Sequence, residues 1–117
     1  MAGSVISIAG TSGIVTPYTF SAAANTYIKI ADGQTGKLAT VVYFSLNATN
    51  NTSYGAWYYP DGLGGYTAIT DRIYVNSNTQ YRNISKYVDA PVGKDLYWGT
   101  NTASPGTING IAGVVFL

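Results

Sequence analysis

The sequence predicts an all-β protein, a single-domain antiparallel β-sandwich or jelly-roll-like barrel of about eight or nine short strands. The apolar segments are short and rich in Val, Ile, Tyr and Phe, and clusters of Gly, Ser, Thr and Asn separate them. No stretch carries apolar residues at helical spacing over three turns. A length of 117 residues suits one domain, so we assign residues 1–117 to a single sandwich.

Segments with strand character recur about every ten residues. They are 5–9, 14–20, 26–31, 38–46, 55–59, 66–75, 81–88, 95–99 and 108–117. Dipeptides such as Asp32-Gly33 and Pro105-Gly106 lie between them, where Pro presets φ and Gly accepts positive φ. Pro17 has no backbone N–H to donate to a neighbouring strand, so we expect its strand to lie at a sheet edge or to contain a bulge.

Alternation assigns the faces of the internal strands. In 26–31, Ile28 and Ile30 point one way and Tyr27 and Lys29 the other, which indicates one wet face. The segment 38–46 is apolar on both faces, so both should be covered. One face is expected to hold Leu38, Val42, Phe44 and Leu46, and the other Val41 and Tyr43.

The two ends of the chain carry separate expectations. The run 108–117 is apolar on both faces, which predicts a central strand or a strand docked on a partner subunit. Residues 1–13 have two interpretations. Val5, Ile6 and Ile8 form either an N-terminal arm that adds a strand to a neighbour or an ordinary first strand of the sandwich.

Charged side chains are scarce and several reactive residue types are missing. Six Lys or Arg and five Asp make up 9% of the chain, against roughly 25% in an ordinary soluble domain. The absence of Cys and His excludes thiolate chemistry, zinc sites and Ser-His-Asp hydrolysis. A net charge of +1 with dispersed cations argues against nucleic acid, and no apolar run reaches the ~18 residues of a membrane-spanning helix.

The carboxylates do not form a catalytic pattern in the sequence. Asp32 and Asp61 precede glycines in turns, where local hydrogen bonding accounts for them. Only Asp71, Asp89 and Asp95 remain as candidates for general acid–base catalysis. An enzyme would need one of them to act together with a Tyr or Lys side chain. We therefore expect no enzymatic activity, no catalytic residues, no metal site and no cofactor.

Aromatic residues carry most of the functional information, with eleven Tyr, two Trp and three Phe. Several of them flank the Pro60-Asp61-Gly62 turn, where Trp57 and Tyr59 share one face and Tyr58 takes the other. Three interpretations stay open: sandwich core and cross-strand pairs, anchors of a protein interface, or stacking platforms for sugar rings. The candidate interface residues are Val5, Ile6, Ile8, Tyr54, Trp57, Tyr58, Tyr59, Tyr66, Trp98, Phe116 and Leu117.

The chain resembles the small all-β accessory proteins of tailed-phage virions, notably head decoration or cement proteins. The resemblance is carried by length, by Ala2-Gly3-Ser4 after Met1, by Ser/Thr/Asn/Gly/Tyr-rich strands and by the lack of Cys and His. It implies a sandwich or jelly-roll-like domain, often trimeric, bound on the capsid exterior where capsomers meet. No site residue can be transferred, because no motif aligns.

The expected function is therefore that of a structural virion protein. It would bind the outer shell through aromatic and apolar contacts and stabilise it, with the major capsid protein and copies of itself, as a homotrimer, for partners. Neither nucleic acid nor a membrane is expected as a partner. With no secretory signal in the sequence, the expected localisation is the capsid exterior after synthesis in the host cytoplasm. The alternative is a carbohydrate-binding or receptor-binding module that uses Trp57, Tyr58, Tyr59 and Trp98.

Overall fold

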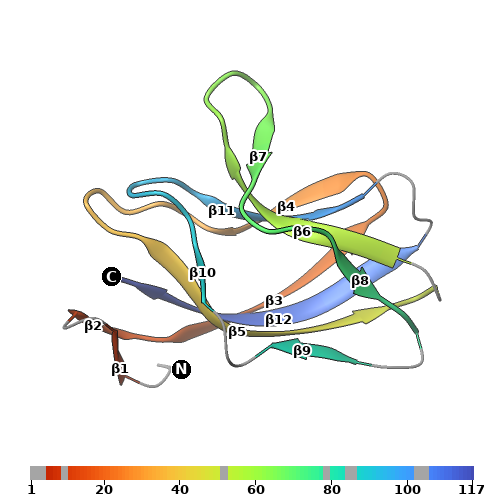
Figure 1. Cartoon of the computed structure of the whole chain (residues 1–117), viewed down its shortest axis with the longest axis horizontal. Helices are drawn as coiled ribbons and strands as arrows, with labels where there is room; N and C mark the ends of the chain where they lie inside the picture. Colours follow the sequence, from red (N-terminus) through yellow and green to blue (C-terminus); the bar gives the residue numbers. More distant parts are fainter. Residues whose placement is uncertain (1–4, 9–10, 51–52, 78–79, 84–86, 102–105) are drawn as a thin grey trace.

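Two antiparallel sheets pack face to face in a sandwich, which confirms the predicted all-β class (Figure 1). The computed structural model describes residues 5–8, 11–50, 53–77, 80–83, 87–101 and 106–117, with only the backbone of 5–8, 11 and 12. The strands are β1 (Val5–Ile8), β2 (Thr11–Ile14), β3 (Thr16–Ala23), β4 (Thr26–Ala31), β5 (Ala39–Ala48), β6 (Ser53–Pro60), β7 (Tyr66–Ala68), β8 (Ile73–Val75), β9 (Tyr81–Asn83), β10 (Val88–Asp89), β11 (Leu96–Thr100) and β12 (Thr107–Phe116).

Each sheet has a continuous middle and one interrupted edge. The first, here called the β5 sheet, has the order β10-β5-β12-β3, and β9 also pairs with β5. The second, the β6 sheet, has the order β4-β11-β6-β7, and β8 also pairs with β6. The predicted strands 66–75 and 81–88 are therefore wrong as single strands, because each supplies two short strands to one long neighbour.

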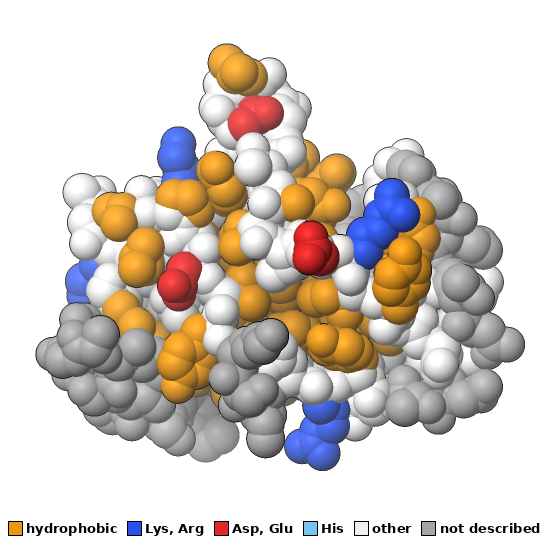
Figure 2. All heavy atoms as spheres, viewed as in Figure 1, with side chains coloured by type: hydrophobic (Ala, Val, Ile, Leu, Met, Phe, Trp, Pro, Cys, Tyr) orange, Lys and Arg blue, Asp and Glu red, His pale blue; other side chains and the backbone are white. Residues whose placement is uncertain are grey.

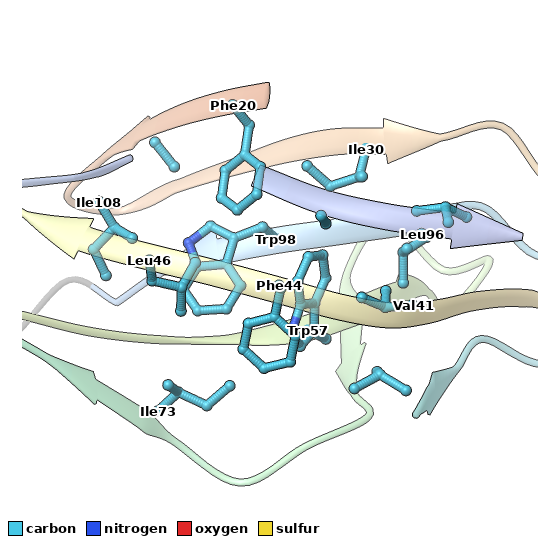
Figure 3. Packing of buried hydrophobic residues seen from close by; sticks show 14 of the residues in the cluster. Phe20, Ile30, Val41, Phe44, Leu46, Trp57, Ile73, Leu96, Trp98 and Ile108 are labelled. Atoms are coloured by element: carbon cyan, nitrogen blue, oxygen red, sulfur yellow. The ribbon is translucent and has the colours of Figure 1, made fainter. Parts of the chain in front are cut away.

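The core lies between the sheets and is centred on four aromatic rings. Trp57 and Trp98 come from the β6 sheet and meet Phe20 and Phe44 from the β5 sheet (Figure 3). The two indoles lie 5.2 Å apart at 77°, and Phe44 stands edge-on to Trp57 at 5.4 Å. Both indoles are fully buried. Edge-to-face pairs of this kind favour association beyond their buried area, by roughly 0.5–1.5 kcal/mol each.

A bulge changes the predicted faces of β5. The register of β5 on β12 shifts between Gly113 and Val114, so that Val41 faces Val114 and Tyr43 faces Gly113. Val41 consequently packs in the main core, whereas Val42 packs in a small cluster on the outer side of the sheet. The prediction that Val42 shares a face with Phe44 and Leu46 is wrong, because the residue inserted at the bulge interrupts the period of two.

Two expectations for the β5 sheet are confirmed. Pro17 lies in β3, an edge strand that pairs only with β12 among the described strands, which is a position where a residue without an N–H is tolerated. β12 is central, between β5 and β3, and Leu117, the residue that follows it, exchanges two backbone hydrogen bonds with Leu38, of 2.8 and 3.0 Å. The apolar C-terminus therefore has partners within its own chain.

The N-terminal hairpin is separate from the sandwich sheets. β1 pairs with β2 in a two-stranded sheet of its own, so the interpretation of 5–9 as an ordinary strand of the sandwich is wrong. The hairpin contacts the sandwich near its second strand, where a Cβ on Gly13 would come within 2.5 Å of Val115 Cγ2. Its function as an arm stays a prediction.

Candidate functional site

The outer face of the β6 sheet is covered with tyrosine side chains. Neighbours in the strands point into the core, as Ile28 and Ile30 do in β4, Trp57 in β6 and Trp98 in β11. The residues that alternate with them point outward. We define the tyrosine face as Tyr27, Tyr54, Tyr58, Tyr66, Tyr74 and Tyr97.

Four of these rings form one connected group across four strands. Tyr27 stacks on Tyr66 at 4.1 Å and 11°, and it meets the edge of Tyr58 at 5.0 Å and 81°. Tyr66 in turn lies 4.9 Å from Tyr97. Tyr27 is 41% exposed and Tyr66 37%, so the group forms a surface that water reaches. Strands β4, β11, β6 and β7 thus each contribute one ring.

Gly99 provides the space in which two of these rings approach the sheet. It lies in β11, where its partners in the pairing register are Tyr27 of β4 and Ala56 of β6, two residues before Tyr58. A Cβ there would be 2.7 Å from a ring carbon of each tyrosine. Any larger residue would displace the rings, so glycine is required for their close packing.

A second group of rings extends the tyrosine face along β6. Tyr54 and Tyr74 are cross-strand partners with ring centroids 5.2 Å apart. The guanidinium of Arg72 lies 4.7 Å from the centroid of Tyr54, a cation–π contact. Tyr54 and Tyr58 alternate in the same way along β6, so both groups of rings lie on one side of the β6 sheet.

The hydroxyl groups on this face are held in a partly desolvated environment. Burial raises the pKa of Tyr58 above 10.0, and the charge and hydrogen bond of Tyr27 add to the rise, while Arg72 acts in the opposite direction. Burial also raises the pKa of Tyr97, with a further contribution from Tyr66. Tyr58 and Tyr97 are thus neutral, amphipathic groups at physiological pH.

Few charged side chains lie on or beside the tyrosine face. Lys29 Nζ forms a salt bridge of 3.0 Å with Asp32 Oδ1 and lies 3.9 Å from Asp95 Oδ2. The hydrogen bond with Asp32 raises the pKa of Lys29. A hydrogen bond with Tyr74 raises the pKa of Arg72. On the side of the molecule that Figure 2 shows, charged side chains are likewise few and scattered among hydrophobic and uncharged ones. Few charges therefore need to be desolvated when this surface is covered.

Two of the predicted interface residues are in the wrong place for that role. Trp57 and Trp98 are 0% exposed and form the centre of the core, so neither indole can stack on a sugar or anchor a partner. The interpretation as sandwich core is the correct one for both. Amphipathic alternation did not reveal this, because the strands that carry them are apolar on both faces.

The other predicted aromatic residues divide between the two sides of β6. Tyr58 and Tyr66 belong to the connected group of rings, and Tyr54 is outward but buried beneath its neighbours. Tyr59 is half-buried and alternates with Tyr58, so it lies on the other side of the strand.

The predicted residues at the chain ends lie away from the tyrosine face. Phe116 is half-buried against the main core, and Leu117 packs on the small outer cluster. Val5, Ile6 and Ile8 are placed as backbone in β1, and their side chains lie outside the described part of the structure.

Sequence reasoning missed Tyr27, Tyr74 and Tyr97 as members of the site. Their signal was present, since Tyr74 and Tyr97 stand between apolar neighbours and Tyr27 alternates with Ile28, which puts each on the opposite face from those neighbours. What the sequence did not reveal was the strand order, which brings residues 27, 58, 66 and 97 side by side.

Four of the five carboxylates have structural partners. Asp89 Oδ1 accepts a 2.8 Å hydrogen bond from the hydroxyl of buried Thr40. Asp95 Oδ1 accepts a 2.6 Å hydrogen bond from the backbone N–H of Gly33. Asp32 pairs with Lys29, and Asp61 accepts backbone N–H groups in its turn. Within the described ranges, no three His, Cys, Asp or Glu residues are grouped closely enough to hold a metal ion.

Comparisons with known proteins give no assignment for this chain. No protein-family model matches it, and no curated protein matches it. In the part of the chain that the structure describes, no helix is long and apolar enough to cross a membrane.

Proposed function

We propose that this chain is a structural, protein-binding subunit of the capsid-decoration type, which attaches to a virion shell through its tyrosine face. The single observation that carries the proposal is the layer of tyrosines on the outer face of the β6 sheet, with few charged side chains among them. Tyrosine is enriched at protein interfaces and charged residues are depleted at their centres.

The way the rings pack favours a protein partner over a sugar. A sugar stacks on an aromatic ring whose flat face is open, but Tyr27 and Tyr66 stack on each other at 4.1 Å and so cover one face of each. The two tryptophans, the strongest sugar platforms in the sequence, are in the core. Tyr27 and Tyr66 remain 41% and 37% exposed, and their amphipathic side chains suit the mixed apolar and hydrogen-bonding surface of another protein.

Binding of this kind needs little rearrangement of the free subunit. The rings are already held by their neighbours and by the strands, so little side-chain entropy is lost on docking. An interface of about 800 Å² per partner is typical of stable complexes. Repeated over many copies on a symmetric shell, contacts of modest individual affinity are sufficient to stabilise it.

The test is co-sedimentation of the purified chain with virion shells from which it has been stripped. We expect saturable binding that falls at least about tenfold in the double variant Tyr27→Ser/Tyr66→Ser, equivalent to about 1.4 kcal/mol. Ile111→Ser is the matched control, because Ile111 is as exposed as Tyr66, at 37%, but belongs to the β5 sheet. Its binding should equal that of the wild type.

Two outcomes would overturn the proposal. One is a tyrosine variant that is folded by circular dichroism and binds shells as the wild type does. The other is saturable binding to an oligosaccharide that is lost in the same variant, with no binding to shells, which would establish the carbohydrate-binding alternative.

A further inference from the structure

The hairpin between β6 and β7 projects from the sandwich and has a leucine at its tip. Figure 1 shows this hairpin rising beyond the two sheets, and in Figure 2 its end is hydrophobic. Leu63 is 91% exposed, the most exposed large apolar side chain among the described residues. An isolated exposed leucine is ordinary, but one at the end of a projecting hairpin has access to another molecule's surface.

A single carboxylate holds the tip in one conformation. Asp61 Oδ1 accepts the N–H of Leu63 at 2.7 Å and the N–H of Gly65 at 3.0 Å, and the Asp61 N–H bonds the Gly65 carbonyl at 3.1 Å. Gly62 and Gly64, on either side of Leu63, have φ of 81° and 89°, which glycine adopts without strain. Leu63 is therefore presented on a pre-organised turn, and the turn itself does not require an apolar residue there.

The same chain has a cavity that such a side chain can enter. It lies where the interrupted edges of the two sheets meet, and its volume is about 300 Å³. The apolar part of its lining comes from both sheets, with Phe44, Ile73 and Val88 together with the rings of Tyr81 and Tyr87. This volume is at the lower end of the range for ligand-binding pockets, which suits one large side chain rather than a cofactor.

We propose that Leu63 of one copy inserts into the cavity between β8 and β10 of a second copy. The charges on the two surfaces support this occupant. Asp61 is the one charged residue of the turn, and Arg72 is the one cationic residue among those that line the cavity, next to Asp71. The pairing places the carboxylate of Asp61 toward Arg72 and away from Asp71, which fixes one orientation of the hairpin.

This contact joins two different surfaces of the chain. It is therefore heterologous, and repeated copies generate either a closed ring or an open chain, depending on the rotation between neighbours. The proposal goes beyond shell binding, because it concerns association of the free chain with itself. Its test needs no shell, so its failure is distinguishable from failure of the proposed function.

Engineered cysteines test the contact directly, since the chain has none of its own. Under mild oxidation, a mixture of Leu63→Cys and Tyr87→Cys chains should give a disulfide-linked dimer that contains one chain of each kind. The double variant Leu63→Cys/Tyr87→Cys should give a ladder or a closed ring. A mixture of Leu63→Cys and Ile111→Cys chains is the control and should give no more cross-linked product than random collision does.

Sedimentation equilibrium gives a second, independent measurement. The wild type should associate reversibly, and Leu63→Asp should weaken that association at least about tenfold without changing the thermal midpoint, because the side chain is exposed. A wild type that stays monomeric up to about 1 mM, or a Leu63→Asp variant that associates normally, would overturn the proposal.

Discussion

The indole Nε1 of Trp98 donates a 3.0 Å hydrogen bond to the buried hydroxyl of Thr100. Trp57 lies against the same indole in the core, yet its own buried Nε1 has no acceptor among the described residues. The two tryptophans are equally buried and differ in this one polar contact. They therefore allow the hydrogen bond to be separated from the packing.

We expect Trp98→Phe to lower the free energy of unfolding by about 1 kcal/mol more than Trp57→Phe does. Both substitutions remove similar volume, but only Trp98→Phe breaks a hydrogen bond and leaves Thr100 Oγ1 without its donor. Urea unfolding followed by tryptophan fluorescence and circular dichroism measures the difference. Equal losses in the two variants would show that the bond makes no net contribution.

Gly99→Ala tests the packing of the tyrosine face. The new Cβ would be 2.7 Å from ring carbons of both Tyr27 and Tyr58, so the rings must move. We expect a loss of about 1–3 kcal/mol in unfolding free energy together with weaker shell binding. The double variant Gly99→Ala/Tyr27→Ala should cost less than the sum of its single changes, because one obstructing ring is gone. Additive costs would contradict the close approach.

High pH should destabilise the fold through Tyr58 and Tyr97. Their pKa values are raised in the folded state, mainly by burial, so the folded protein retains these protons more strongly than the unfolded chain. The resulting stabilisation is complete below the unfolded pKa of about 10 and is lost as pH rises through the folded values. Urea unfolding at increasing pH, compared between the wild type and Tyr58→Phe/Tyr97→Phe, measures this. Identical slopes for the two proteins would contradict it.

Removal of residues 1–10 should leave the sandwich folded. β1 pairs only with β2 among the described strands, and a two-stranded hairpin on its own is marginally stable in water. We expect a cooperative thermal transition close to that of the full chain. If assembly is lost while folding is retained, the hairpin acts as an arm. Global unfolding of the truncated chain would show that the hairpin is essential to the core.

Removal of residues 112–117 should unfold the protein. This deletion takes half of a central strand, including Val114 and Val115, whose burial contributes roughly 1.5–3 kcal/mol each. The lost ladder bonds add to that, and a whole domain of this size is stable by only about 5–15 kcal/mol. Removal of Leu117 alone, which breaks the two bonds with Leu38, is the mild control. A folded 1–111 chain by circular dichroism would contradict the central role of β12.

The sequence by itself determined the all-β class, and it limited Pro17 to a sheet edge or a bulge and the apolar C-terminal run to a central or a partner-docked strand. Each follows from local chemistry: the period of side chains along a strand, a missing N–H, or two apolar faces that must both be covered. The wet face of β4, with Tyr27 and Lys29 on it, followed in the same way.

Tertiary structure alone decided which tyrosines meet and which aromatic residues lie inside. Tyr27, Tyr58, Tyr66 and Tyr97 come together because β4, β11, β6 and β7 are neighbours, and strand order depends on long-range pairing that no local pattern encodes. Strands that are apolar on both sides do not reveal which side faces the other sheet, so Trp57 and Trp98 could not be placed in advance. The bulge at Val42 likewise depends on how β5 pairs with β12, since an inserted residue exists only relative to a partner strand.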